Sequence, residues 1–184
     1  DRTKKEFEGF LYTLSAQNGI CGLDDRCLAS DDAGAIYFAS AAGQLQKIED
    51  TGHELKIGCV SQVEPRLYHP MGPSASAGLI WVAAHGPGGG PFWDSGGGGE
   101  VALFWDNEKE LVFVERFGTP GKAADKLEFL NPSAVASSPD HTELWIAEDG
   151  LKNPEGPPGN ARVRRFKFAA TQMEEIPFEW KTAK

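Results

Sequence analysis

The chain has 184 residues, of which 40% are hydrophobic and 24% are charged, values that are typical of a globular protein and of neither a disordered nor a membrane class. Its formal net charge of −9 repels phosphate backbones and anionic lipid heads, which argues against nucleic acid as a partner. No run approaches the roughly 20 apolar residues of a membrane span, and 22 glycines with 12 prolines favour short strands and turns over long helices.

The N-terminal segment begins without a methionine or an apolar signal core, which we interpret as processing or as a piece of a longer chain. The compartment is left open, including an organelle lumen or the extracellular space. Cys21 and Cys27 could close a small disulfide loop in an oxidising compartment or remain buried thiols. Together with Cys59 they fit no zinc spacing.

Three successive segments share one pattern of small residues, a turn, an apolar strand ending in alanine, a polar loop and a strand of mixed charge. The apolar strands are rich in aromatic and β-branched residues and are expected at Ile36–Ala39, Ile80–Ala83 and Leu144–Ala147. Runs of small residues precede them at 28–30, 73–76 and 134–137, and a further apolar segment closes each unit at 53–60, 109–117 and 172–178. Each unit therefore has four predicted strands.

Four short antiparallel strands that repeat about every 40 to 50 residues are typical of β-propeller blades. We predict an all-β chain, a partial β-propeller of about three four-stranded antiparallel blades in a single domain over residues 1–184. The blades are expected at approximately 20–60, 61–118 and 128–178, and residues 7–14 (FEGFLYTL) resemble a strand of a preceding blade. The best helical candidate, Gly121–Leu130, lies between two blades.

Three blades do not close a ring, because propellers use about four to eight blades. An open arc would leave the faces and edges of its end blades uncovered. The chain is then, for example, half of a six-bladed ring. Either the remaining blades belong to a longer chain or an association completes the propeller ring.

Two long loops are expected on one face of this scaffold. The segment Gly86–Gly99 interrupts the hairpin between strands Leu79–Ala83 and Val101–Trp105, and Glu148–Asn160 lies at the equivalent place in the third unit. The first loop has no Lys or Arg to bind a phosphate, which argues against a nucleotide-binding loop. Binding usually resides on long loops of a rigid scaffold, so the candidate binding residues are His85, Phe92, Trp93, Asp94, Glu148 and Asp149.

Several of these residues allow two interpretations. Phe92 and Trp93 either contact a partner surface or fold back over the propeller face. Glu148 and Asp149 form either an acid/base or cation-binding pair or a solvated turn. No nucleophile motif such as GxSxG is present.

One basic patch stands out in the acidic chain. It could dock an acidic protein partner, balance carboxylates in a neighbouring blade, or simply form an ordinary strand of mixed charge. Its members are Arg162, Arg164, Arg165 and Lys167.

The pattern over residues 131–168, with LWIAED followed by RVRRF, resembles NHL-repeat propellers and the related gluconolactonase and strictosidine-synthase-like propellers. The resemblance extends more loosely from about residue 20. In the lactonase branch it implies a divalent cation held by Asn or Asp residues that open the inner strands. Those positions fall here on Arg26, Pro70 and Ser133, with Asn131 and Asp149 as the nearest substitutes.

Ca²⁺ prefers six to eight oxygen ligands with several carboxylates, so we predict no metal ligands and no cofactor. The leading hypothesis is a non-catalytic β-propeller binding or scaffold module with protein partners, part of a larger assembly. The alternative is a Ca²⁺-dependent lactonase or esterase-type hydrolase, in which the cation polarises the lactone carbonyl. An NHL-type peptide- or RNA-binding module is a third hypothesis, which the negative charge disfavours for RNA.

Overall fold

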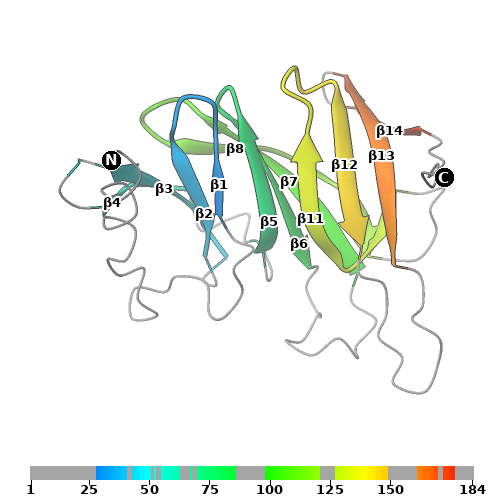
Figure 1. The fold of residues 1–184 in the computed structure, drawn as a ribbon. Helices are drawn as coiled ribbons and strands as arrows, with labels where there is room; N and C mark the ends of the chain where they lie inside the picture. The colour runs from blue at the N-terminus through cyan, green and yellow to red at the C-terminus, as the bar shows by residue number, and fades with distance from the viewer. Residues whose placement is uncertain are drawn as a thin grey trace, which may run out of the picture.

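The computed structural model describes residues 28–40, 43–50, 52, 55–62, 67, 70–85, 98–120, 127–148, 161–169 and 172–176. Within these residues the chain forms β-strands and no helix. Three antiparallel sheets stand side by side in an open row (Figure 1). The predicted fold class, an all-β partial propeller, is confirmed, whereas the segment 7–14 and the pair Cys21 and Cys27 lie outside the described residues.

Sheets A and C each contain four consecutive strands. Sheet A runs in the order β1 (Leu28–Ser30), β2 (Ile36–Ala39), β3 (Leu45–Asp50) and β4 (Leu55–Val60). Sheet C runs in the order β11 (Pro132–Ser137), β12 (Glu143–Glu148), β13 (Arg162–Ala169) and β14 (Gln172–Ile176). The small-residue runs thus form the first strands, and the aromatic segments form the second strands.

Sheet B, the middle sheet, has two more strands than the predicted four. It comprises β5 (Pro70–Ser76), β6 (Leu79–His85), β7 (Gly98–Asp106), β8 (Leu111–Phe117), β9 (Thr119–Pro120) and β10 (Glu128–Leu130). β8 pairs with the distal part of β7, and β10 pairs with its first residues. The extra strands come from the segment that connects sheets B and C.

The helical prediction for Gly121–Leu130 is wrong where the structure describes it. Glu128–Leu130 is the strand β10, and Phe129 pairs with Gly99 across the sheet. Phe129 is fully buried and packs against Phe166 of sheet C, with ring centroids 5.7 Å apart. Burial of this aromatic side chain between two sheets outweighs the local preference of the segment.

The predicted loop over Gly86–Gly99 is shorter at its C-terminal end, because Gly98 and Gly99 belong to β7. Gly99 pairs with His85 on one side and with Phe129 on the other. A Cβ atom at Gly99 would lie 1.8 Å from Cδ of Pro132. The glycine therefore lets β7 pass closely beneath the start of sheet C.

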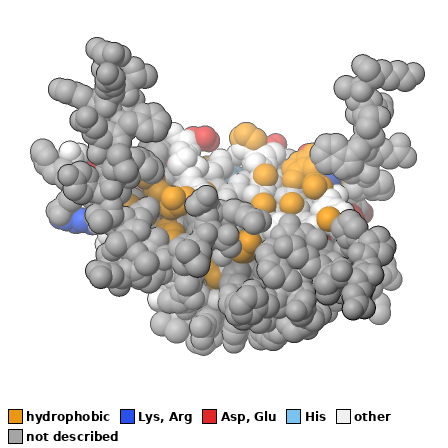
Figure 2. Space-filling view, turned by 60° about the horizontal axis from the view of Figure 1, so that its bottom comes forward, with side chains coloured by type: hydrophobic (Ala, Val, Ile, Leu, Met, Phe, Trp, Pro, Cys, Tyr) orange, Lys and Arg blue, Asp and Glu red, His pale blue; other side chains and the backbone are white. Residues whose placement is uncertain are grey.

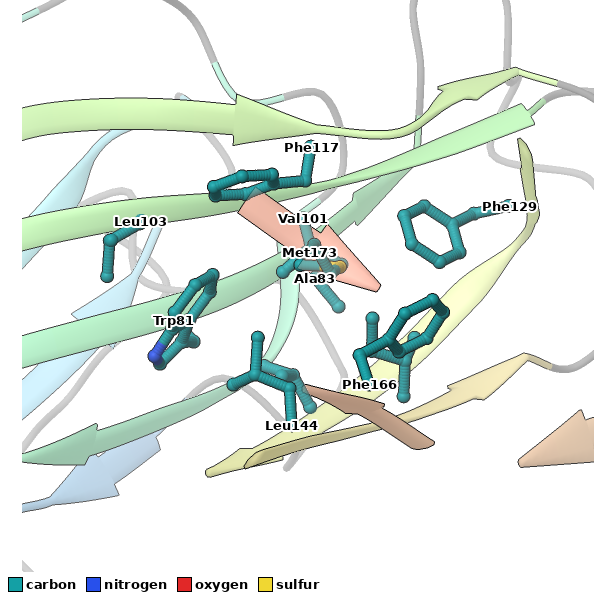
Figure 3. Close-up of a cluster of buried hydrophobic side chains, with 11 residues drawn as sticks. Trp81, Ala83, Val101, Leu103, Phe117, Phe129, Leu144, Phe166 and Met173 are labelled. Carbon is teal, nitrogen blue, oxygen red and sulfur yellow. The ribbon is translucent and has the colours of Figure 1, made fainter. Parts of the chain in front are cut away.

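Two hydrophobic cores hold the row together, one at each junction between sheets. The core between sheets B and C is built around Trp81 and includes Phe117, Phe129, Leu144 and Phe166 (Figure 3). The ring of Phe168 lies 4.8 Å from that of Trp81 in an edge-on contact. The core between sheets A and B contains Tyr37, Leu45, Ile80 and Phe104. Sheet B thus uses alternating side chains of β6 to contact both of its neighbours.

The inner strands β1, β5 and β11 lie next to one another. Gly72 of β5 has a φ of 36°, and a Cβ there would lie 2.7 Å from Cα of Ala134 on β11. The hydroxyl oxygens of Ser74 and Ser137 are 3.2 Å apart across the same junction. The small residues of these strands are therefore required by close packing.

Strands β2, β6 and β12 all end at the lower end of the molecule in Figure 1. His85 and Glu148 are the last residues of β6 and β12, so they lie at this same end. Among the described residues, hydrophobic side chains are visible across this end, and acidic and basic side chains lie toward its margins (Figure 2).

Candidate functional site

The predicted loop-face residues are only partly described. His85 ends β6 opposite Gly99, and Glu148 ends β12 opposite Arg162. The side chain of His85 and the whole of Phe92, Trp93, Asp94 and Asp149 lie outside the described residues.

Glu148 is the most deeply buried carboxylate of this end, with a side chain 0% exposed. Its Oε2 atom accepts a hydrogen bond of 3.0 Å from Nη2 of Arg162. Its Oε1 atom accepts one of 3.3 Å from Nη1 of Arg164. Glu148 is therefore an ion-pair partner of two arginines on the neighbouring strand, not part of a solvated turn.

Arg164 joins sheet C to sheet B. Its side chain is 2% exposed and donates a hydrogen bond of 2.8 Å to the backbone carbonyl of Glu128 on β10. Its Nε atom donates to Oε1 of Glu175 over 3.0 Å, and its guanidinium lies 4.8 Å from the ring centre of Phe166. Burial alone would lower the pKa of Arg164, but the carboxylates of Glu175 and Glu148 outweigh it and raise this pKa.

The other members of the basic patch lie differently. Arg165 pairs on the opposite face of sheet C with Glu143, its Nε atom 3.1 Å from Oε2, and its guanidinium stacks 5.2 Å from the ring centre of Trp145. Lys167 is exposed. The three arginines thus pair with carboxylates of their own sheet, Glu143, Glu148 and Glu175.

The positions that the lactonase resemblance assigns to a cation do not suit Ca²⁺. Pro70 opens β5 and offers no side-chain oxygen, and Ser133 lies at the start of β11 with its hydroxyl 3.5 Å from the carbonyl oxygen of Ala147. Asn131 is buried just before β11, and Arg26 lies outside the described residues. Within the described ranges no group of three His, Cys, Asp or Glu residues could hold a metal ion.

A second polar cluster, which sequence reasoning missed, joins sheets A and B at the opposite end. Asp106 at the end of β7 accepts hydrogen bonds at Oδ2 from the hydroxyl of Tyr37, at 2.8 Å, and from Nζ of Lys47, at 2.6 Å. Its Oδ1 atom accepts a bond of 2.7 Å from the backbone N–H of Glu108. The sequence signal that could have indicated this cluster is the position of Asp106 at the end of a strand, directly before the turn residues Asn107, Glu108 and Lys109.

The pKa shifts of this cluster follow from its contacts. Burial would raise the pKa of Asp106, but the hydrogen bonds from Lys47 and Tyr37 lower it below its usual value. The bond to Asp106 raises the pKa of Lys47, while burial and the same carboxylate raise that of Tyr37. These shifts favour the charged forms of Lys47 and Asp106. The two side chains therefore form a salt bridge that connects sheets A and B.

Glu100 is a buried carboxylate beside the glycine-rich loop. Its side chain is 6% exposed, and Oε2 lies 3.0 Å from Nε of Arg116. Its Oε1 atom has no hydrogen-bond partner among the described residues. Burial raises the pKa of Glu100, against the opposing effect of Arg116.

This shift predicts a pH dependence of stability. The folded state holds the Glu100 proton more tightly than the unfolded state, so the contribution to stability is present below the usual pKa of 4.5 and is lost as the pH rises through the folded pKa. We expect Glu100→Gln to flatten this fall in the free energy of unfolding as the pH rises above 4.5, as measured by urea unfolding. The exposed Glu115→Gln should follow the wild type; parallel curves for wild type and Glu100→Gln would contradict the prediction.

The outer face of sheet A carries exposed apolar side chains. The cross-strand pairing places Leu28, Phe38, Gln46 and Val60 in one row and Ser30, Ile36, Ile48 and Ile57 in the next. Leu28, Ile57 and Val60 are 40%, 49% and 39% exposed. The central residues of this face, Phe38, Gln46 and Ile48, are 1%, 8% and 6% exposed, so the open part is its edges. The edge strand β4, which carries Ile57 and Val60, is the candidate interaction surface.

The sequence matches no protein-family model and no curated protein. Among solved structures, the chain is similar to an oxidoreductase (glucose dehydrogenase) from Thermus thermophilus, with a TM-score of 0.45 and 14% identity over 72% of this chain and 39% of that chain. The chain thus spans about two fifths of the length of that structure. Within its described part, no helix has the length and hydrophobicity to cross a bilayer. The chain's own architecture establishes its fold, three antiparallel sheets of a partial β-propeller.

Proposed function

We propose that the chain is a non-catalytic binding module of the β-propeller type that works within a larger protein assembly. The observation that carries this proposal is the edge strand β4 of sheet A, where Ile57 and Val60 are 49% and 39% exposed. Apolar side chains that gather on one surface are typical of protein contacts. The repeat itself is proposed to derive from the NHL and gluconolactonase-like propellers that it resembles.

The charged groups at the sheet junctions support the same proposal. Arg164, which pairs with Glu148 of its own sheet, donates a hydrogen bond to the backbone carbonyl of Glu128 in sheet B, and Asp106 of sheet B pairs with Lys47 of sheet A. Separating the partners of a buried ion pair is strongly unfavourable, so such pairs fix the relative position of the strands that carry them. The proposed role of these residues is to hold the sheets in line, so that the edge strand β4 is a rigid surface for a partner.

The test compares protein capture with hydrolysis. Immobilised wild-type chain is expected to retain a protein partner from an extract of its source, and Ile57→Asp is expected to lose that partner. Val114→Asp, which alters a side chain 43% exposed on β8, should retain it. Lactone hydrolysis should stay at the background rate with and without Ca²⁺. Turnover that Ca²⁺ accelerates would support the hydrolase instead, and capture that is indifferent to Ile57→Asp would overturn the proposed surface.

A further inference from the structure

One face of each sheet carries the same kinds of residue at the same places in the register. An aromatic residue and an alanine stand two positions apart on the second strand, and a branched apolar residue pairs with the alanine from the third strand. We call the face that bears these side chains the forward face. Its three residues are Tyr37, Ala39 and Leu45 in sheet A, Trp81, Ala83 and Val101 in sheet B, and Trp145, Ala147 and Val163 in sheet C.

The forward faces of sheets A and B are covered by the next sheet of the row. In sheet A the three residues belong to the core that is shared with sheet B. In sheet B they belong to the core that is shared with sheet C. All six side chains are at most 1% exposed. The chain thus uses this face twice to receive a following sheet.

The forward face of sheet C is open. Sheet C ends the row of described sheets (Figure 1). Trp145, Ala147 and Val163 are all partly exposed, and none of the three is a member of either hydrophobic core. They repeat, residue type for residue type, the tryptophan, alanine and valine that sheet B buries against sheet C. Sheet C therefore presents an uncovered copy of a face that packs against a sheet elsewhere in the chain.

A short extended segment accompanies each of the two covered faces. Leu67, just before sheet B, donates its backbone N–H to the carbonyl oxygen of Gly43 over 3.0 Å, and Phe129, just before sheet C, pairs with Gly99. Both apolar side chains are buried in the core of their junction. Both glycines stand two residues before the branched residue of their forward face. The equivalent position in sheet C is Ala161, which is exposed and pairs with no described strand.

Arg165 supplies a charge that a following sheet can neutralise. Its equivalent in sheet A is Lys47, which pairs with the aromatic residue of the forward face and whose Nζ atom lies 2.6 Å from Oδ2 of Asp106, at the end of the third strand of sheet B. Arg165 pairs with Trp145 in the same register, and its side chain is 30% exposed beside Glu143. A carboxylate at the end of the third strand of a following sheet would form a second bridge of this kind.

From these equivalences we infer that the forward face of sheet C binds a further four-stranded sheet of the same repeat, packed face to face as propeller blades are. Such a sheet carries branched apolar residues on its second strand, as sheet C carries Leu144 and Ile146 toward sheet B. It is preceded by an apolar residue in an extended segment, and it ends its third strand with a carboxylate. The surface is not the edge strand β4, so the inference goes beyond the proposed function.

The first experiment tests whether this face is open in the chain itself. Val163→Asp and Ala147→Glu are expected to shift the urea midpoint by less than about 0.5 M, as surface substitutions do. Val101→Asp, the matched variant in sheet B, should lower it by more than about 1 M, because it buries an unpaired charge. A Val163→Asp variant that is as unstable as Val101→Asp would show that the face is already covered, and would overturn the inference.

Sedimentation of the wild type tests the competing occupant, a second copy of the chain. We expect the monomer mass of 19.9 kDa. A dimer that Val163→Asp dissociates would assign the face to self-association and would overturn the inference.

The second experiment supplies a following sheet as a defined probe. Residues 118–178, which contain the connecting segment and sheet C, are appended to the full set of three sheets after Phe178. Ala161→Gly is introduced in the first copy, because at the equivalent Gly99 a Cβ atom would lie 1.8 Å from Cδ of Pro132. The extended chain should unfold in one transition, at a urea midpoint no lower than that of the original chain.

The decisive comparison is the cost of Val163→Asp in the two chains. In the extended chain, the substitution in the first copy should lower the urea midpoint by more than about 1 M, because the carboxylate is then buried under the appended sheet. Val114→Asp, on the exposed part of β8, should have the same small effect in both chains. An appended sheet that does not pack leaves Val163→Asp equally harmless in both, which would overturn the inference.

The outcomes separate this inference from the proposed function, which is tested through Ile57 on β4. An extended chain that packs as expected, together with no capture that depends on Ile57, leaves the inference standing and overturns the proposed function. Capture that depends on Ile57, together with an appended sheet that does not pack, has the opposite meaning.

Discussion

Arg164→Met is expected to lower the free energy of unfolding by about 3–5 kcal/mol, the usual cost of removing one partner from a buried ion pair. The side chain of Glu148 is 0% exposed and would lose one of its two arginine partners, keeping Arg162, which is itself partly exposed. The backbone carbonyl of Glu128 and the ring of Phe166 would also lose the guanidinium. The hydrogen bond that Arg164 makes from sheet C to β10 would then be lost.

The measurement is urea unfolding at neutral pH, with Lys167→Met as the matched control. Lys167 lies on the same strand and is exposed, so its replacement should change stability by no more than about 0.5 kcal/mol. The double variant Glu148→Leu with Arg164→Met should recover part of the loss, because it also removes the buried carboxylate that has lost the Arg164 guanidinium. A loss for Arg164→Met no larger than that for the control would contradict the assigned role.

Gly99→Ala is expected to destabilise the protein by about 3 kcal/mol, at the upper end of the usual cost of overpacking. The new methyl group would lie 1.8 Å from Cδ and 2.3 Å from Cγ of Pro132. Because the ring of a proline is tied to its own backbone, it cannot rotate away as a flexible side chain would. Either β7 or the start of β11 must move, and both are held by neighbouring strands.

Gly34→Ala is the control for this substitution. A Cβ atom at Gly34 would have no other atom within 4 Å, but the residue has a φ of +85°, so alanine there costs only the backbone strain of about 1 kcal/mol. Thermal or urea unfolding of both variants gives the comparison. Equal losses would show that β7 does not pass Pro132 as closely as the structure has it.

Local sequence pattern was sufficient to predict the strand arrangement within the repeats. The motifs IYFA, IWVA and LWIA combine β-branched and aromatic residues that suit a sheet buried on both faces, and they form β2, β6 and β12. The small residues before them form the inner strands, since close packing such as that at Gly72 leaves no room for larger ones.

The candidate site was less predictable, because it depends on contacts between distant segments. The patch of Arg162, Arg164 and Arg165 was recognised, but alternation along β13 sends Arg164 into the junction with sheet B and Arg165 to the opposite face. Asp106 is 59 residues from Lys47 and 69 from Tyr37. No local pattern reports that these three side chains meet.

The sequence by itself determined the all-β class, the four-strand unit and its threefold repetition, because alternation and turn residues act within a few positions of each other. Only the tertiary structure decided that Glu128–Leu130 is a strand, that Glu148 is buried beside two arginines, and that Ile57 and Val60 are exposed on the edge strand β4. These features arise when strands far apart in the chain pair or pack, and the free energy of those contacts outweighs local preference.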